Sequence, residues 1–320
     1  MKLAIREFQP TDAEYQAIAK LDGSVWPDYA TTAEEFRFED ETQDPKYVSQ
    51  SVVAELNGEI VAFGWYEETY WSYQPGKYMI SCRVHPKHER KGIGAAFYEY
   101  VMEKLAGLGA AKFVASSRED KPQGIRFLEK RGFKQVMRIP ISLLDVTKFD
   151  PAPFASSMDK AKEHGIRFRP LAELEKSDPD WKQKILDLRW QIVQDVPSPE
   201  PPSQIPLETY DKQVYQHPNL FKEGWIIALD GDKYVGYSNL WKMPGKPGKL
   251  NTGLTGVMRS YRRLGICTAV KLQAIAAARR LGITQIETDN EENNPMYQIN
   301  LRLGFQPRPA WLSFMREIQK

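Results

Sequence analysis

Two acidic residues near the end of the chain have the type and spacing that proton transfer requires. Glu287 and Asp289 alternate with apolar or neutral residues in the segment QIETD. On a strand, both carboxylates would therefore project from one face. A close pair of carboxylates raises the pKa of one member, which suits a general base that acts on an amine. The alternative is structural: the pair lies at a solvated sheet edge, or Asp289 caps the following turn.

Two other segments, one in each half of the chain, have the composition of an anion-binding loop. Residues 89–94 read ERKGIG and residues 262–267 read RRLGIC, each between an expected strand and an expected helix. The first N–H groups of a helix lack helical partners, and the helix dipole favours an anion there. We therefore expect phosphate binding, although a tight strand–helix junction would also explain the glycines. Neither segment is a dinucleotide or Walker motif.

The elements that must position these residues occur twice. Residues 52–86 and 225–258 each predict three strands, joined by a tight turn at Asn57-Gly58 or Asp230-Gly231 and then by a Pro/Gly turn. The hairpin glycine precedes the loop glycine by 34 residues in both halves. After each loop, the pattern predicts a helix, a strand and a second helix that closes on Gly-Phe. We predict two copies of a β-α-β-β-β-α-β-α-β unit, with domains at 1–150 and 151–320.

Composition narrows the class of protein. The chain has 320 residues, of which 42% are hydrophobic, and its 44 basic and 42 acidic residues nearly balance. This balance argues against a nucleic-acid partner, and the absence of a long apolar run argues against a membrane partner. Cys82 and Cys267 are expected to be free thiols in a reducing compartment, and the scattered histidines and cysteines predict no metal site. We expect a cytoplasmic α/β enzyme that is a monomer or a homodimer.

The order of elements and the loops resemble the GNAT superfamily of N-acetyltransferases. The family pattern Gln/Arg-x-x-Gly-x-Gly/Ala is matched by Arg262, Gly265 and the small Cys267, whereas the first half has Glu89 at the Gln/Arg position. The tandem arrangement is similar to that of mycothiol-synthase-type proteins. The resemblance implies an α/β fold of the α+β type, with two GNAT-like domains. Each would be a twisted, mixed and mainly antiparallel sheet flanked by helices.

The resemblance also implies that acetyl-coenzyme A is the cosubstrate. In the family, loop amides bind its pyrophosphate, and its pantetheine arm lies between the fourth and fifth strands. The implied cosubstrate-binding residues are Val257, Arg262, Arg263, Gly265, Ile266, Cys267, Thr268 and Asn293 in the second half, and Val84, Arg90, Lys91, Gly92, Gly94 and Ala95 in the first. Asn293 matches a family asparagine, whereas Lys121 has that offset in the first half. The second domain therefore carries the fuller motif and is the one we expect to be catalytic.

The reaction that the resemblance implies is direct acetyl transfer to a small-molecule amine in a ternary complex. Glu287 and Asp289 are the candidate bases. The tyrosine that protonates the leaving thiolate in many family members is replaced by Leu128 and Asn300. Tyr297, one helical turn before Asn300, is a candidate acid, although half-buried helix packing is the simpler interpretation of it.

Two alternatives remain open. Catalysis in the N-terminal domain would take its base from Glu67 or Glu68, because the fifth strand of the first half has no acid. A module that binds and senses acetyl-coenzyme A without transferring the acetyl group is the other alternative, and the missing tyrosine favours it.

Overall fold

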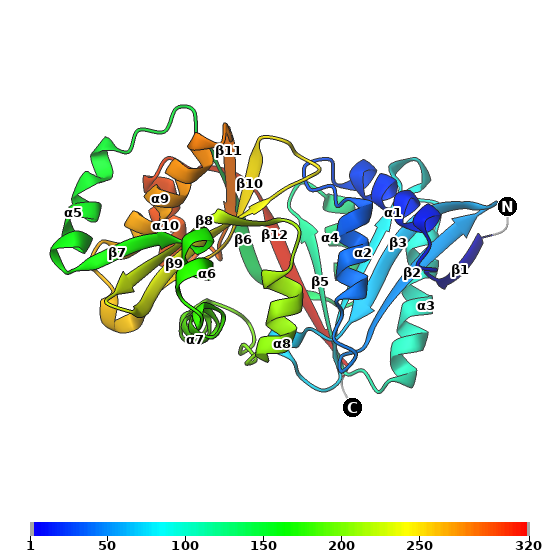
Figure 1. Cartoon of the computed structure of the whole chain (residues 1–320). Coiled ribbons are helices and arrows are strands. Elements are labelled where there is room, and N and C mark those ends of the chain that lie inside the picture. The colour runs from blue at the N-terminus through cyan, green and yellow to red at the C-terminus, as the bar shows by residue number, and fades with distance from the viewer. Residues whose placement is uncertain (1–2, 319–320) are drawn as a thin grey trace. The chain divides into compact units, whose positions relative to one another are not determined.

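The computed structural model describes residues 3–318 and contains the expected repeat (Figure 1). The first copy comprises β1 (Leu3–Glu7), α1 (Asp12–Val25), α2 (Ala33–Glu41), β2 (Ser49–Leu56), β3 (Glu59–Glu67), β4 (Lys77–Val84), α3 (Ile93–Gly107), β5 (Lys112–Arg118), α4 (Pro122–Glu129) and β6 (Lys134–Asp145). Between the copies lies α5 (Ala155–Glu163). The second copy comprises β7 (Ile166–Pro170), α6 (Leu171–Ser177), α7 (Trp181–Val193), α8 (Leu207–Tyr210), β8 (Leu220–Asp230), β9 (Lys233–Lys242), β10 (Lys249–Val257), α9 (Ile266–Arg280), β11 (Gln285–Asp289), α10 (Pro295–Arg302) and β12 (Gln306–Glu317).

The chain forms two compact units that exchange their last strands. Unit 1 contains residues 1–138, 244–246 and 311–320, and unit 2 contains residues 139–243 and 247–310. In unit 1, β5 pairs antiparallel with Trp311–Glu317 of β12. In unit 2, β11 pairs antiparallel with Ile141–Asp145 of β6. The boundary expected near residue 150 separates the two sequence repeats, but each compact unit takes its last strand from the other repeat.

The sheet of unit 1 runs in the order β1-β2-β3-β4-β5-β12, and only the β4–β5 pair is parallel. Helices α1 and α2 cover one face, where Ile18 and Phe36 pack on Phe63 and Val53. The opposite face carries a second core, in which Phe97 and Leu105 of α3 are fully buried. The α1/α2 face therefore lies against a separate apolar cluster from the α3 face.

The sheet of unit 2 runs β6-β11-β10-β9-β8-β7, with a parallel β10–β11 pair. Helix α9 packs its apolar face on one side, against Leu250, Ile286 and Leu144. Helix α7 covers the other side, where Ile192 approaches Gly256 so closely that a Cβ there would overlap it. Alternation along the strands therefore assigns each side chain to the α9 face or the α7 face.

One predicted turn is displaced by a residue. In the first hairpin, Leu56 pairs with Glu59, and Asn57 and Gly58 both have positive φ as expected. In the second hairpin, Asp230 pairs with Lys233, so the two loop residues are Gly231 and Asp232. The predicted Asp230-Gly231 turn is therefore wrong. Both hairpins have a register shift just before the turn, between Ala54 and Glu55 in the first and between Ala228 and Leu229 in the second, but β8 pairs one residue further than β2 does.

Candidate active site

A fork opens in each sheet where its two parallel strands separate. Strands β4 and β5 pair only from Lys77 to Met79 on the β4 side. Strands β10 and β11 pair only from Lys249 to Asn251 on the β10 side. Beyond these pairs, the backbone N–H and C=O groups of each strand that face the gap are not paired with the other strand. An extended ligand can form hydrogen bonds with them as an additional strand would. Each fork widens toward the glycine loop that follows β4 or β10.

Only the second fork has a β-bulge beside it. Thr252 pairs with Leu240 and Thr255 with Ser238, so Gly253 and Leu254 together face Asn239. The Leu254 N–H donates to Asn239 Oδ1 at 2.6 Å. The β3–β4 ladder next to the first fork is regular from Val84 to Met79. A bulge changes the direction of backbone groups and is common beside active sites.

The two glycine loops have the same backbone geometry. Arg90 and Gly92 have φ of 61° and 82°, and Arg263 and Gly265 have φ of 66° and 78°. Each glycine is the N-cap, and α3 and α9 begin at the next residue, with no side-chain cap on the first-turn N–H groups. Left-handed backbone suits glycine, whereas the arginines adopt it at some cost. Both loops therefore present the helix N-terminus that phosphate binding requires.

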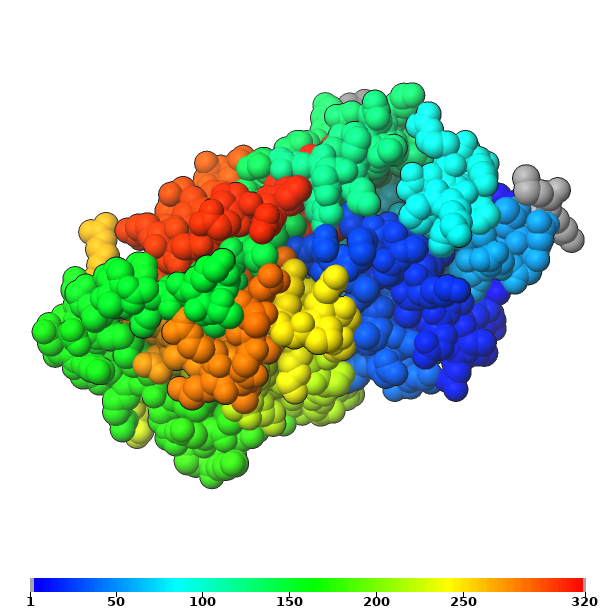
Figure 2. All heavy atoms as spheres, turned by 90° about the horizontal axis from the view of Figure 1, so that it is seen from above, coloured from blue at the N-terminus to red at the C-terminus, as the bar shows by residue number. Residues whose placement is uncertain are grey.

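The surroundings of the two loops differ. A Cβ at Gly92 would meet open space, whereas a Cβ at Gly265 would overlap the Ser157 carbonyl at the start of α5. Met158 of α5 also packs on the core of α9. The green surface of the α5 segment adjoins the orange surface of α9 in Figure 2. The connection between the repeats thus supports one side of the second loop.

The arginines of the second loop have separate roles. Arg262 donates from Nε to the Val257 carbonyl at 3.5 Å and forms an ion pair with Asp195. Asp195 also accepts from Arg259 Nε at 3.0 Å, and hydrogen bonds from Arg259, more than those from Arg262, lower the pKa of Asp195 to about 2. Arg262 is therefore fixed, whereas Arg263 is exposed at the loop surface. Arg263 is the charge that a bound phosphate could recruit.

The predicted residues of the first loop lie where the sequence placed them. Val84 ends β4, and Arg90 and Gly92 are exposed. Lys91 Nζ donates to the Lys87 carbonyl at 2.9 Å. Gly94 and Ala95 lie in the first turn of α3. A Cβ added at Gly94 would make ordinary van der Waals contacts with Val84 and Phe127.

The remaining predicted residues of the second loop surround the first turn of α9. Ile266 is buried, whereas Cys267 and Thr268 are partly exposed. Cys267 Sγ lies 3.7 Å from Met296 Sδ, and burial raises the pKa of its thiol to about 11. Asn293 Nδ2 donates to Glu291 Oε1 at 2.8 Å. Tyr297 is half-buried on α10.

The two acids of β11 share a face, as expected, but their environments differ. Glu287 is buried, and its Oε2 lies 2.6 Å from Lys249 Nζ. Asp289 is reached by solvent, yet desolvation by the surrounding protein raises its pKa to about 6, and the Glu287 carboxylate contributes to the rise. Because Glu287 forms an ion pair with Lys249, Asp289 is the carboxylate that is suited to accept a proton. The sequence did not indicate Lys249 as this partner.

Unit 1 has a different set of titratable groups on its α1/α2 face. Desolvation raises the pKa of Glu67 to about 7, and a hydrogen bond from Trp65 opposes this. The pKa of Glu39 also rises to about 7, because of desolvation and then the charges of other acids, Glu67 among them. Arg83 Nη1 lies 2.7 Å from the buried Asp22 Oδ1, and its guanidinium stacks 4.6 Å from the Trp65 ring centre. The sequence pointed to Glu67 but not to Glu39, Arg83 or Asp22.

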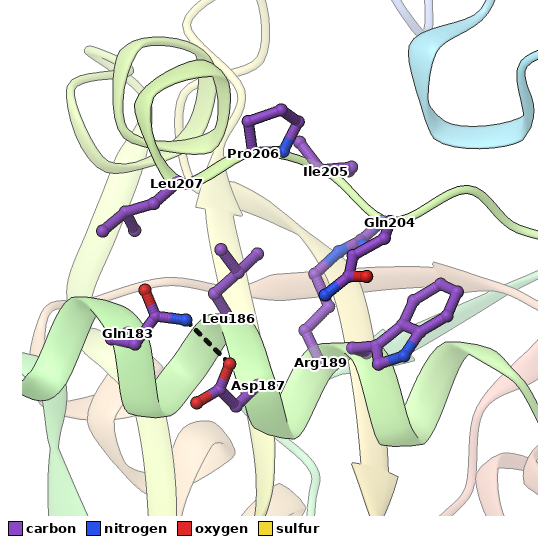
Figure 3. Close-up of a pocket in the computed structure, with 9 residues that line it drawn as sticks. Gln183, Leu186, Asp187, Arg189, Gln204, Ile205, Pro206 and Leu207 are labelled. Atoms are coloured by element: carbon purple, nitrogen blue, oxygen red, sulfur yellow. Dashed lines mark hydrogen bonds between the residues drawn. The ribbon is translucent and has the colours of Figure 1, made fainter.

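A separate hollow lies beside α7 in unit 2 (Figure 3). Its volume is about 340 Å³, and residues 204–207 cross it opposite α7. Gln183 Nε2 donates to Asp187 Oδ1 at 2.7 Å, while Arg189 and Gln204 line the other end. The hollow is open, and polar side chains alternate in its lining with Leu186, Ile205 and Leu207, whereas a typical small-molecule site is enclosed.

Residues 3–318 carry neither a membrane-spanning helix nor a metal-binding cluster. No helix among them is long and apolar enough to cross a membrane. They also contain no cluster of three or more histidine, cysteine or acidic side chains that could hold a metal ion.

Comparison with known proteins agrees with the fold. The model of the acetyltransferase (GNAT) family matches residues 14–133 and 189–305. A GCN5-related N-acetyltransferase from Sphaerobacter thermophilus has a TM-score of 0.70 at 18% identity, over 99% of this chain and 96% of that one. A tandem GNAT protein from the clavulanic acid biosynthesis pathway has a TM-score of 0.76 at 17% identity, over 100% and 99% of the two chains. No curated protein matches the chain.

Because the family model matches both repeats, the chain is a tandem acetyltransferase of two GNAT-like domains. The chain belongs to the acetyltransferase (GNAT) family. It is an acyl-coenzyme A-dependent N-acetyltransferase.

Proposed function

We propose that the chain transfers the acetyl group of acetyl-coenzyme A to a small-molecule amine, and that the C-terminal repeat performs the reaction. The observation that carries this proposal is the second fork: it combines the bulge at Gly253–Leu254, a glycine loop with the exposed Arg263, and Asp289. The residues suit the cosubstrate, because loop N–H groups and Arg263 would bind its diphosphate and the fork would take its extended arm.

The fork, Asp289 and Glu287 of the C-terminal repeat have different roles in the proposed reaction. Holding the amine against the thioester supplies much of the rate enhancement, and a backbone N–H at the fork stabilises the oxyanion. Asp289 takes the proton from the attacking ammonium or amine, since a base with a pKa near 6 is ionised at neutral pH. Glu287 stays paired with Lys249 and adds negative charge that attracts the cationic substrate.

A direct experiment is thiol release from acetyl-coenzyme A against a panel of amines, comparing the native chain with Asp289→Asn. We expect turnover with at least one amine and a loss of 100-fold or more in kcat/KM in the variant, in the range of removing a general base. Tight coenzyme A binding without turnover on any amine would instead favour a sensing module.

One observation supports a second candidate, catalysis in the N-terminal repeat. Its loop is open at Gly92, and Glu67 has a pKa of about 7. Glu67→Gln is therefore the matched comparison for Asp289→Asn. If Glu67→Gln removes the activity and Asp289→Asn retains it, the reaction belongs to the first repeat.

A further inference from the structure

Helix α9 buries a lysine that has no partner. Lys271 lies in the second turn of the helix, and only 3% of its surface is exposed. Its Nζ lies 5.6 Å from the centre of the Phe305 ring. No side chain or carbonyl among residues 3–318 forms a hydrogen bond or an ion pair with it. Lysine is almost never buried to this extent unless it is paired.

Burial of this lysine destabilises the ligand-free fold. Desolvation lowers the pKa of Lys271 to about 8, and the charge of the Cys267 thiol opposes this. Cys267 is the one titratable group of the described chain whose charge acts on it. Because the pKa stays above 7, the ammonium is largely charged at neutral pH without a carboxylate beside it. An unpaired buried charge is costly, so the residue is a candidate for function.

The first repeat shows that packing does not require a lysine at this position. Tyr98 follows Gly92 by six residues, as Lys271 follows Gly265. The Tyr98 ring packs edge-on to Phe133, whose counterpart is Phe305, at 6.5 Å. The Tyr98 hydroxyl accepts a hydrogen bond from Arg316 Nη1 at 2.6 Å. The same place in α3 is therefore filled by a neutral side chain that has a partner.

Lys271 lies on the side of α9 that faces α10. Strands β10 and β11 are parallel, so the helices that follow them begin at the same end of the fork. Cys267 Sγ and Met296 Sδ, at 3.7 Å, join the first turns of these two helices. Lys271 is four residues after Cys267 and therefore shares its face of α9.

The direction of the side chain brings its charge toward the glycine loop. Lys271 follows Ile266, the first residue of α9, by five residues, or roughly 8 Å along the axis. Long side chains on a helix point back toward its N-terminus, so the ammonium approaches the first turn. The N–H groups of that turn have no side-chain cap. Two independent features therefore favour an anion at this end of α9.

From this placement we propose that Lys271 is the buried positive charge that attracts the diphosphate of coenzyme A to the second loop. The proposal rests on the proposed function of the second repeat. The loop N–H groups and the exposed Arg263 would contact the diphosphate from the solvent side, and Lys271 acts on it from the α10 side. The bound diphosphate supplies the negative charge that the ligand-free fold lacks. Tyr98 gives the first loop no such charge.

Coenzyme A titration calorimetry on Lys271→Met tests the proposal. We expect affinity to fall about tenfold or more, because a charge in a poorly solvated place acts strongly on a nearby diphosphate. The matched control is Arg280→Met, which removes a positive charge from the exposed last turn of the same helix and should bind with near-native affinity.

Thermal unfolding without ligand gives a second measurement. Lys271→Met should have a higher Tm than the native chain at pH 7, because the unpaired charge is gone. This gain should shrink as the pH rises from 8 toward 10.5, the range in which the native lysine is neutral when folded but charged when unfolded. A lower Tm in Lys271→Met at every pH would show that the lysine only packs, and would contradict the proposal.

A third measurement uses the native chain and needs no variant. Affinity for desulfo-coenzyme A, which has no thiol to titrate, should fall several-fold from pH 7.5 to 9 as Lys271 loses its charge. Affinity independent of pH would count against the lysine.

The outcomes separate this proposal from the proposed function. Native coenzyme A affinity in Lys271→Met, with affinity lost in Arg263→Glu, would overturn the role of Lys271 alone. Native affinity in both variants would overturn binding at the second loop, and the role of Lys271 with it.

Discussion

At the scale of the residue, Asp289 links activity to stability. Its pKa is raised to about 6, so the folded state holds its proton more tightly than the unfolded state does. The stabilisation this provides is complete at low pH and is lost as the pH rises through 6. Ionised Asp289 therefore destabilises the fold at the pH where it would act as a base.

Two measurements follow for Asp289. In the native chain, kcat/KM should fall as the pH drops below about 6, because the base becomes protonated. Asp289→Asn should raise Tm at pH 8, and this gain should shrink as the pH is lowered toward 4. A Tm difference that is independent of pH would show that the carboxylate is not perturbed in the folded state.

The sequence allowed part of this site to be predicted. Strand alternation was sufficient to place Glu287 and Asp289 on one face. It could not indicate that Lys249 engages Glu287, because the pairing depends on the β10–β11 register.

At the scale of the element, the two loops differ in what supports them. Their backbones match, and the repeat made this predictable from glycine positions alone. The contact of α5 with the second loop was not predictable, because residues 150–165 have no counterpart in the other half. Alanine at either loop glycine incurs left-handed strain of about 1–2 kcal/mol.

Gly265→Ala should therefore destabilise the fold more than Gly92→Ala. At Gly265 the added Cβ must also displace the Ser157 carbonyl, whereas at Gly92 it meets open space. Urea unfolding of both variants measures the difference, which we expect to exceed about 1 kcal/mol. Equal losses would mean that α5 does not hold the second loop.

Because a side chain at Gly265 also disturbs the fold, the exposed arginines of the two loops are better probes of coenzyme A binding than the glycines. Arg90 and Arg263 have the same residue type, similar positive φ and exposed positions in the two loops. Substitution at these sites changes charge without filling the space beside the glycine.

At the scale of the whole molecule, the exchange of strands ties the two repeats together. The order of elements within each repeat followed from periodicity and turn residues. The exchange of strands could not be predicted, because the sequence pattern of the last strand is the same whether the strand joins its own sheet or another. Unit 1 consequently needs Trp311–Glu317 to cover the edge of β5.

A chain cut at residue 150 tests this dependence. Residues 1–150 alone should unfold at a lower temperature or aggregate, because β5 lacks its partner and Phe314 no longer fills the core on the α3 face. Adding residues 306–318 through a flexible linker should restore cooperative unfolding, measured by circular dichroism. A cooperative transition at the same Tm with and without the added strand would contradict the account.

Coenzyme A titration calorimetry on Arg263→Glu and Arg90→Glu tests the central claim most directly. Reversing a charge beside a bound diphosphate weakens binding by about tenfold or more. The account predicts this loss for Arg263→Glu and near-native affinity for Arg90→Glu. A loss confined to Arg90→Glu, or native affinity in both variants, would contradict it.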